Sequence, residues 1–130
     1  MNSQGRTMTG PLQQFVIQEH TTPAGVHWDL MLQINDILWT WRLPIPPEQL
    51  SSETVIAERI FNHPLRFLSY EGPVQDKTGS VQIADHGKYI LENKTEGKLE
   101  IDFKGKLLTG RYTLTQQNGH RWLLSALPTV

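Results

Sequence analysis

Two histidines and an aspartate near the start of the sequence are its clearest candidates for chemistry. His27 and Asp29 are two residues apart, so on a β-strand their side chains point to the same side. His20 precedes them, and the Thr21–Val26 link suits a tight return that brings the two imidazoles together. Two imidazoles and one carboxylate with open positions form a catalytic ligand set for manganese, zinc or iron. The spacing alone also fits a hydrogen-bonded surface pair of His27 and Asp29.

A β-hairpin is predicted to carry this cluster. Two strand-like runs, Val26–Gln33 and Ile37–Leu43, flank an Asn-Asp turn that places Ile34 opposite Ile37. One face is then wholly apolar and consists of Trp28, Leu30, Leu32, Ile34, Leu43, Trp41, Trp39 and Ile37. The other face is more polar and consists of His27, Asp29, Met31, Gln33, Pro44, Arg42, Thr40 and Leu38. We expect the first face to be core and the second to carry the metal site.

Strand and turn signals also dominate the rest of the sequence. Phe15–His20 and Thr54–Ile60 have the composition of strands, and Pro47–Leu50 is suited to a short helical turn after the third strand. Glycines then recur about every ten residues, a rhythm typical of hairpins, at Gly72, Gly79, Gly87, Gly97, Gly105, Gly110 and Gly119.

These signals predict a mainly β fold. We expect a single compact, antiparallel β-barrel-like domain of about eight strands with at most one or two short helices. Residues 1–14, which carry one charge and no periodic pattern, are expected to form a flexible or irregular N-terminal arm. The β domain would then span residues 15–130.

Composition narrows the choice of partners. The 130 residues fit one domain, and the absence of cysteine excludes disulfides and thiolate metal ligands. Twelve basic and thirteen acidic residues argue against non-specific coating of nucleic acid, although a few local arginines could still hold one phosphate. We find no signal peptide and no apolar run of membrane-spanning length. The expectation is a monomeric, cytoplasmic protein without a membrane partner.

The other histidines have simpler interpretations. His63 stands before a proline and could be a turn histidine. His86 and His120 adjoin glycines in turn-like contexts, and we interpret both as structural.

Two further features are candidates for a functional role. Trp39 and Trp41 are predicted to be core rather than a base-stacking platform, because their face is apolar. Glu71 could act as a base near the site or be a solvated loop acid, and the loop position favours the second reading.

Six ordered sequence blocks resemble a known family. FVIQEH, HWDLML, ILWTWRLP, NHPLRFLSYEGP, TGSV, and TGRYTL with WLL are similar, in this order, to the 3′-phosphoesterase module of bacterial DNA ligase D. The resemblance runs from Phe15 to Leu124 and is strongest to small stand-alone versions of the module.

The resemblance implies a fold, an activity and a set of site residues. The family forms a compact β-barrel-like domain that trims 3′ ends in break repair, removing a terminal ribonucleoside and then the 3′-phosphate with manganese. Its metal ligands match His20, His27 and Asp29, and the active-site histidine of its HPL motif matches His63. Manganese is therefore the expected cofactor, with zinc or another divalent transition metal as the alternative.

The sequence departs from the family pattern at phosphate-binding positions. Met31 stands where the family has an arginine, and Phe67 where it has a tyrosine, although Tyr70 is nearby. The acidic segment that often precedes the first strand is not recognisable, and one extra residue separates the two histidines. The metal ligands are thus retained while the phosphate contacts are fewer.

Arg42 is the candidate to compensate for the missing arginine. It lies across from Asp29 in the predicted register, where it could hold phosphate as a catalytic and substrate-binding residue, or only form an ion pair with Asp29. Arg66 and Tyr70 are further candidates for substrate binding.

Three functions remain open from the sequence. The first is a metal-dependent phosphoesterase acting on 3′-phosphate or 3′-ribonucleotide ends of DNA, together with ligase or polymerase repair components. The second is a catalytically weak or inactive module that binds DNA ends or a repair partner and keeps the metal site. The third is a hydrolase of a small phosphate ester, which the near-neutral charge suggests.

Overall fold

A barrel of antiparallel strands forms the body of the protein. The computed structural model describes residues 12–74 and 79–128, so most of the predicted N-terminal arm, residues 1–11, lies outside the described residues. The strands are β1 (Gln13–Thr22), β2 (Gly25–Ile34), β3 (Ile37–Leu43), β4 (Val55–His63), β5 (Gly72–Pro73), β6 (Ser80–Thr95), β7 (Lys98–Gly105), β8 (Thr109–Asn118) and β9 (Arg121–Ala126). Their order in the sheet is β1-β2-β3-β4-β9-β8-β7-β6-β5, and β1 also pairs with β6.

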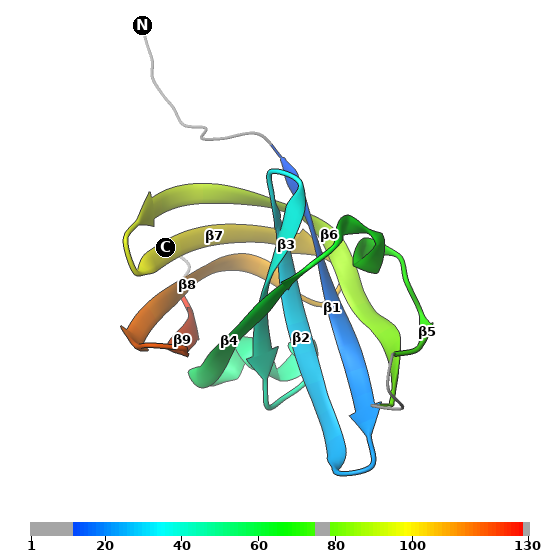
Figure 1. The fold of residues 1–130 in the computed structure, drawn as a ribbon. Coiled ribbons are helices and arrows are strands. Elements are labelled where there is room, and N and C mark those ends of the chain that lie inside the picture. The colour runs from blue at the N-terminus through cyan, green and yellow to red at the C-terminus, as the bar shows by residue number, and fades with distance from the viewer. Residues whose placement is uncertain (1–11, 75–78, 129–130) are drawn as a thin grey trace, which may run out of the picture.

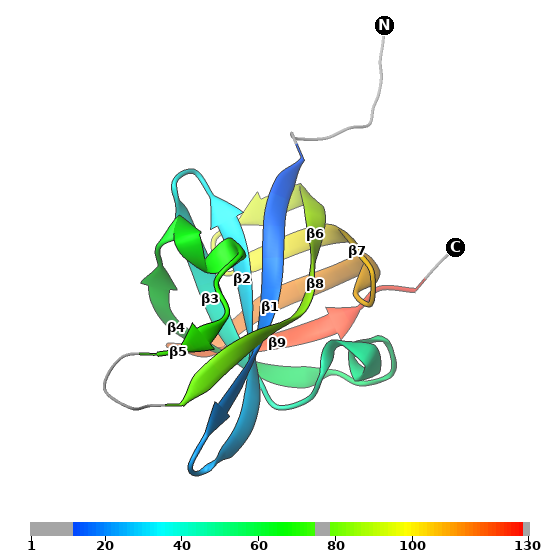
Figure 2. The ribbon, with the colours of Figure 1, turned by 90° about the vertical axis from the view of Figure 1, so that its right-hand side faces the viewer.

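The β1–β6 pairing closes the sheet. Figures 1 and 2 show the strands curling round a central core, with the β1–β2 hairpin projecting past one end of the barrel. Within the described residues the helical structure is limited to two 3₁₀ segments, η2 (Pro47–Ser52) and η3 (Leu65–Leu68). The predicted mainly β, barrel-like fold is confirmed. No helix in the described part of the chain is long and apolar enough to cross a membrane.

The predicted β2–β3 hairpin has the predicted register. Ile34 lies opposite Ile37, and Asp29 lies opposite Arg42. Asn35 in the turn has a φ of 59°, the left-handed conformation that a tight two-residue hairpin turn requires. The helical turn expected after β3 is η2, which begins at Pro47. β4 begins one residue later than predicted and continues to His63.

The apolar face of this hairpin is core over most of its length, as predicted, whereas Ile34 and Ile37 beside the turn are half-buried. Trp41 and Leu30 are fully buried, and Trp41 meets the Trp122 ring from β9 edge to face with centroids 5.5 Å apart. In the same core, Phe15 and Phe103 make a similar edge-to-face contact at 5.0 Å.

The second face of the hairpin is polar over only part of its length. Met31 and Leu38 are buried there with Val16 in a second, smaller core. Leu65, Phe67, Leu68 and Ile83 pack against that core and cover it. Thr40 is buried within this covered stretch, and the other polar side chains lie on either side of it, with His27, Asp29 and Arg42 toward one end and Gln33 beside the turn.

One glycine marks a close approach of strands rather than a turn. Gly87 lies within β6, and a Cβ there would come within 2.3 Å of the Lys104 carbonyl oxygen. His86 is accordingly an exposed strand residue opposite Val16, so the predicted turn at this histidine is wrong. The turn context of His120 is confirmed, because it lies between β8 and β9.

Candidate metal centre and substrate cleft

The β1–β2 hairpin places the two candidate histidines side by side. His20 is the direct cross-strand partner of His27. The strands are joined by a turn at residues 23 and 24, where the Thr22 hydroxyl accepts from the Ala24 amide and donates to the Gly25 carbonyl, each at 3.1 Å. The tight return predicted from the sequence is present, and both strands continue past the histidines.

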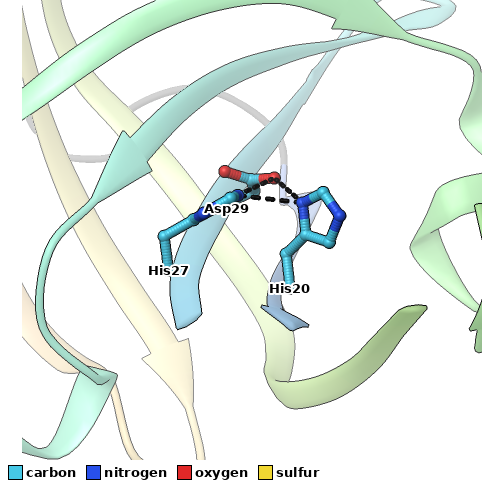
Figure 3. Close-up of side chains that lie close together, drawn as sticks. All are labelled: His20, His27 and Asp29. Carbon is cyan, nitrogen blue, oxygen red and sulfur yellow. Dashed lines mark hydrogen bonds and ion pairs between the residues drawn. The ribbon is translucent and has the colours of Figure 1, made fainter. Parts of the chain in front are cut away.

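The three candidate ligands converge on one point. Nδ1 of His20 lies 2.8 Å from Nε2 of His27, and each of these nitrogens lies 3.9 Å from Oδ2 of Asp29. Figure 3 shows the three side chains turned toward one another from β1 and β2. One donor atom from each residue lies within 4.8 Å of the others. Two imidazoles and one carboxylate at this spacing suit one divalent transition-metal ion with positions left for other ligands.

The Asp29 carboxylate has different neighbours at its two oxygens. Oδ2 faces the imidazoles, whereas Oδ1 accepts a hydrogen bond from Nε of Arg42 at 3.2 Å. Asp29 is only 3% exposed, so it depends on these neighbours to offset the loss of solvation. The ion pair considered from the sequence is therefore present. It occupies one of the five N–H groups of Arg42, and the described residues supply no acceptor for the other four.

Burial lowers the pKa of two of the site histidines and so favours their neutral form. It lowers the pKa of His27, and the Arg42 and His20 charges act in the same direction while Asp29 opposes them. Burial also lowers the pKa of His63, again opposed by Asp29. A neutral imidazole is the form that binds a metal or accepts a proton.

His63 ends β4 and is held from three sides. Its Nδ1 lies 2.8 Å from the Thr40 hydroxyl, which also lies 3.3 Å from the Leu38 carbonyl oxygen. Because that carbonyl can only accept, we assign the hydroxyl hydrogen to it and the Nδ1 hydrogen to His63. The His63 ring stacks on Phe61 with centroids 4.8 Å apart and meets Phe67 edge to face at 5.3 Å.

A cleft of about 520 Å³ lies beside these residues. The sequence-predicted residues that line it are His20, Asp29, Arg42, His63, Arg66 and Tyr70. His27 instead lines an adjoining hollow, which Arg42 also lines. The structure thus brings all seven predicted site residues to one region, with His27 at its margin.

Arg66 and Tyr70 lie on the segment that walls the cleft. The Arg66 guanidinium sits over the Phe67 ring, 4.7 Å from its centroid, and 5.7 Å from that of Tyr70. The Tyr70 hydroxyl donates to the Pro73 carbonyl. Glu71 is exposed and accepts from the Ile83 amide at 2.9 Å, a structural contact that agrees with its reading as a loop acid.

Two cleft residues were not singled out from the sequence. Gln18 is 1% exposed, and its amide donates to the carbonyls of Phe67 and Tyr70 at 3.0 and 3.1 Å, which ties the cleft wall to β1. The sequence signal that could have indicated Gln18 is its position two residues before His20 in a mostly apolar strand, which places both side chains on the same side of that strand. Phe61 is 73% exposed at the mouth of the cleft, and nothing in its sequence context indicated this position.

Comparison with known proteins identifies the family. The model of the DNA ligase D 3′-phosphoesterase domain matches residues 18–116, a stretch that contains the whole cluster and the cleft wall. The chain belongs to this 3′-phosphoesterase domain family. The resemblance stated from the sequence blocks is thereby confirmed.

Three relatives are multifunctional non-homologous end joining proteins named LigD. The Mycobacterium tuberculosis H37Rv protein is 31% identical over 129 residues, covering 94% of this chain and 17% of its own length. The Mycolicibacterium smegmatis protein is 28% identical, and the match covers 88% of this chain and 17% of that protein. The Pseudomonas aeruginosa protein is 25% identical, and the match covers 82% of this chain and 14% of that protein. The chain thus spans about a sixth of the length of the mycobacterial relatives.

Apolar contacts occupy the two positions that depart from the 3′-phosphoesterase pattern. Met31 is 1% exposed and belongs to the second core. Phe67 packs on that core and on the edge of His63. Neither side chain carries a charge that could pair with a phosphate.

Proposed function

We propose that this protein is a divalent-metal-dependent phosphoesterase that processes 3′-phosphate or 3′-ribonucleotide ends during DNA repair. Membership of the 3′-phosphoesterase domain family supports the reaction class. The observation that carries the proposal is the convergence of His20, His27 and Asp29 beside a cleft lined by Arg42 and His63. The names of the relatives support a role in end joining, for which DNA ends and ligase or polymerase components are the proposed partners.

His20, His27 and Asp29 would hold the ion. The donor set of two nitrogens and one oxygen suits manganese, our first choice, as well as zinc or another divalent transition metal. A bound ion would polarise a phosphoryl oxygen and lower the pKa of water. Arg42 orients the Asp29 carboxylate through Oδ1 and leaves Oδ2 directed at the imidazoles.

Arg42 is the residue we assign to phosphate neutralisation. It lines the cleft, its side chain is 37% exposed, and only its Nε–H is engaged by Asp29. Its remaining N–H groups can form charge-assisted hydrogen bonds to phosphate oxygens, each worth about 1.5–3 kcal/mol. Arg66, which also lines the cleft, adds a second positive charge.

His63 is the residue we assign to proton transfer. The Thr40 hydroxyl holds its Nδ1–H, so Nε2 is the nitrogen that can exchange a proton with water or with the leaving group. Its lowered pKa leaves it ready to accept a proton at neutral pH.

The proposal is tested with a primer-template that carries a 3′-phosphate. We expect the purified protein with manganese to release phosphate, and His27→Ala to abolish the release while keeping the wild-type circular dichroism spectrum. Product no greater than that of the His27→Ala control, from a folded wild-type protein with bound manganese, would refute the proposal.

The apolar residues at positions 31 and 67 favour a second candidate, a module that binds DNA ends without turnover. This candidate predicts wild-type binding of a 3′-phosphate end without release of phosphate. Release that depends on His63 would exclude it.

A further inference from the structure

A second, basic hollow adjoins the cleft. It has a volume of about 710 Å³, and its lining includes Arg42, Arg59, Phe61 and His120 but no aspartate or glutamate. Arg42 and Phe61 line the cleft as well, so they form the boundary between the two. An anion in this hollow would meet cationic side chains and no carboxylate in its lining.

Arg59 is the best-placed cation of this hollow. Its guanidinium packs over the indoles of Trp39 and Trp41, with its carbon 4.9 and 5.0 Å from the ring centroids. It donates to the Ile60 carbonyl at 2.7 Å and to the Asn62 side-chain oxygen at 3.0 Å. These bonds occupy two of its five N–H groups, and no carboxylate of the described residues pairs with it. The charge is fixed in place and lacks a protein anion.

Phe61 has the properties of a stacking surface. At 73% it is the most exposed of the large hydrophobic residues in the described part of the chain. One side of its ring stacks on His63, with an interplanar angle of 25°. An exposed aromatic ring between an active-site cleft and a basic hollow is well suited to stack a nucleobase, a contact available to every base.

We propose that the basic hollow binds a backbone phosphate of the nucleic-acid strand next to the processed 3′ end, while a base of that strand stacks on Phe61. Arg59 contacts this phosphate and Arg42 lies between the two phosphate positions. The inference rests on the proposed function for the direction of the strand, but the binding itself requires neither turnover nor metal. The predicted ligand is therefore a strand of at least two nucleotides.

The first test measures the salt dependence of binding in the presence of a chelator. The probe is a 5′-fluorescein trithymidylate with a 3′-phosphate, followed by anisotropy. For Arg59→Gln we expect affinity to fall about tenfold and the slope of log K against log salt to shrink by about 0.7, the value for one lost phosphate contact on a single strand. Arg111→Gln, which removes an equal charge from an arginine paired with Glu92, should change neither quantity. Equal effects of the two variants would overturn the inference.

The second test separates a strand from a free phosphate. Wild-type affinity should rise from the 3′-phosphorylated mononucleotide to the trinucleotide, and Arg59→Gln should remove most of that rise. Phe61→Ala should weaken trinucleotide binding about tenfold, and Phe61→Tyr should restore it. Inorganic phosphate that competes as well as the trinucleotide, or an Arg59→Gln loss that is the same for every length, would contradict the strand path.

The outcome is distinguishable from that of the proposed function. Binding with the expected Arg59 dependence but no phosphate release with manganese would refute the phosphoesterase and keep the strand site. Phosphate release by a protein whose strand binding is unchanged in Arg59→Gln would support the phosphoesterase and refute the strand site.

Discussion

Nε of Arg42 lies 3.2 Å from Oδ1 of Asp29, while Oδ2 of the same carboxylate faces the two histidines. The arginine therefore contacts the opposite oxygen from the one offered to a metal. The sequence posed ion pairing with Asp29 and phosphate binding as alternatives for Arg42. The geometry makes them compatible, because the ion pair occupies a single N–H of the guanidinium.

Removing the Arg42 charge should reduce catalysis more than metal binding. For Arg42→Gln we expect kcat/KM on a 3′-phosphate primer-template to fall ten- to a hundredfold, which corresponds to one charge-assisted phosphate contact. Arg42→Lys should retain part of the rate, since it keeps the charge but not the planar donors. A wild-type value of kcat/KM for Arg42→Gln would contradict a role of Arg42 in phosphate binding and would restrict its role to the ion pair with Asp29.

Introducing the arginine typical of the family at position 31 should destabilise the fold rather than raise activity. Met31 is buried against Val16 and Leu38, so Met31→Arg places a charge among apolar groups, at a cost of about 3 kcal/mol or more. Met31→Leu, which conserves volume, should cost less than about 1.5 kcal/mol. Urea unfolding measures both, and a stable, more active Met31→Arg variant would contradict this view of the second core.

Asp85 is expected to be important for the β7–β8 connection. It is 3% exposed and accepts from the amides of Lys106, Leu107 and Leu108 at 3.0, 3.1 and 2.7 Å. Asp85→Ala leaves these donors without an acceptor and should lower the free energy of unfolding by about 2–4 kcal/mol. The matched control is Asp102→Ala, which removes a surface ion pair with Lys104 and should cost less than about 1 kcal/mol. Similar losses for the two variants in thermal or urea unfolding would argue against this role.

The lowered pKa of His63 has a defined effect on stability. In the unfolded chain its pKa is near the ordinary 6.5, so between the folded and unfolded values the unfolded state binds more protons. The free energy of unfolding should therefore fall as the pH drops through 6.5 toward the lower, folded pKa, and His27 adds to the effect. Urea titrations between pH 5 and 8 should show this fall, and His63→Asn should reduce it. An NMR titration of His63 with a pKa above 6.5 would contradict the expectation.

Much of the hairpin that carries the site was predictable because its pattern is strict. Alternating apolar residues and a two-residue Asn-Asp turn leave one register for β2 and β3, and the structure has it. The cross-strand pairing of His20 and His27 follows from the same logic, since a proline-containing link between strands favours a tight turn.

Features that depend on distant pairing were not predictable. Gly87 marks a close approach to Lys104, which no local pattern distinguishes from a turn. Arg59 acquires its setting only when β4 lies between β3 and β9, and Phe61 gains its exposure from the same placement. The partial burial of the second hairpin face arises because η3 folds back over it, a tertiary contact that overrides the apparent polarity of the strand.

The most direct measurement for the central claim is a crystal structure of the protein grown with manganese and sulfate. We predict an anomalous difference peak bonded to imidazole nitrogens of His20 and His27 and to the carboxylate of Asp29, with a sulfate in the cleft contacted by Arg42. A manganese ion bound elsewhere, or saturating manganese that leaves these three side chains without a peak, would contradict the account.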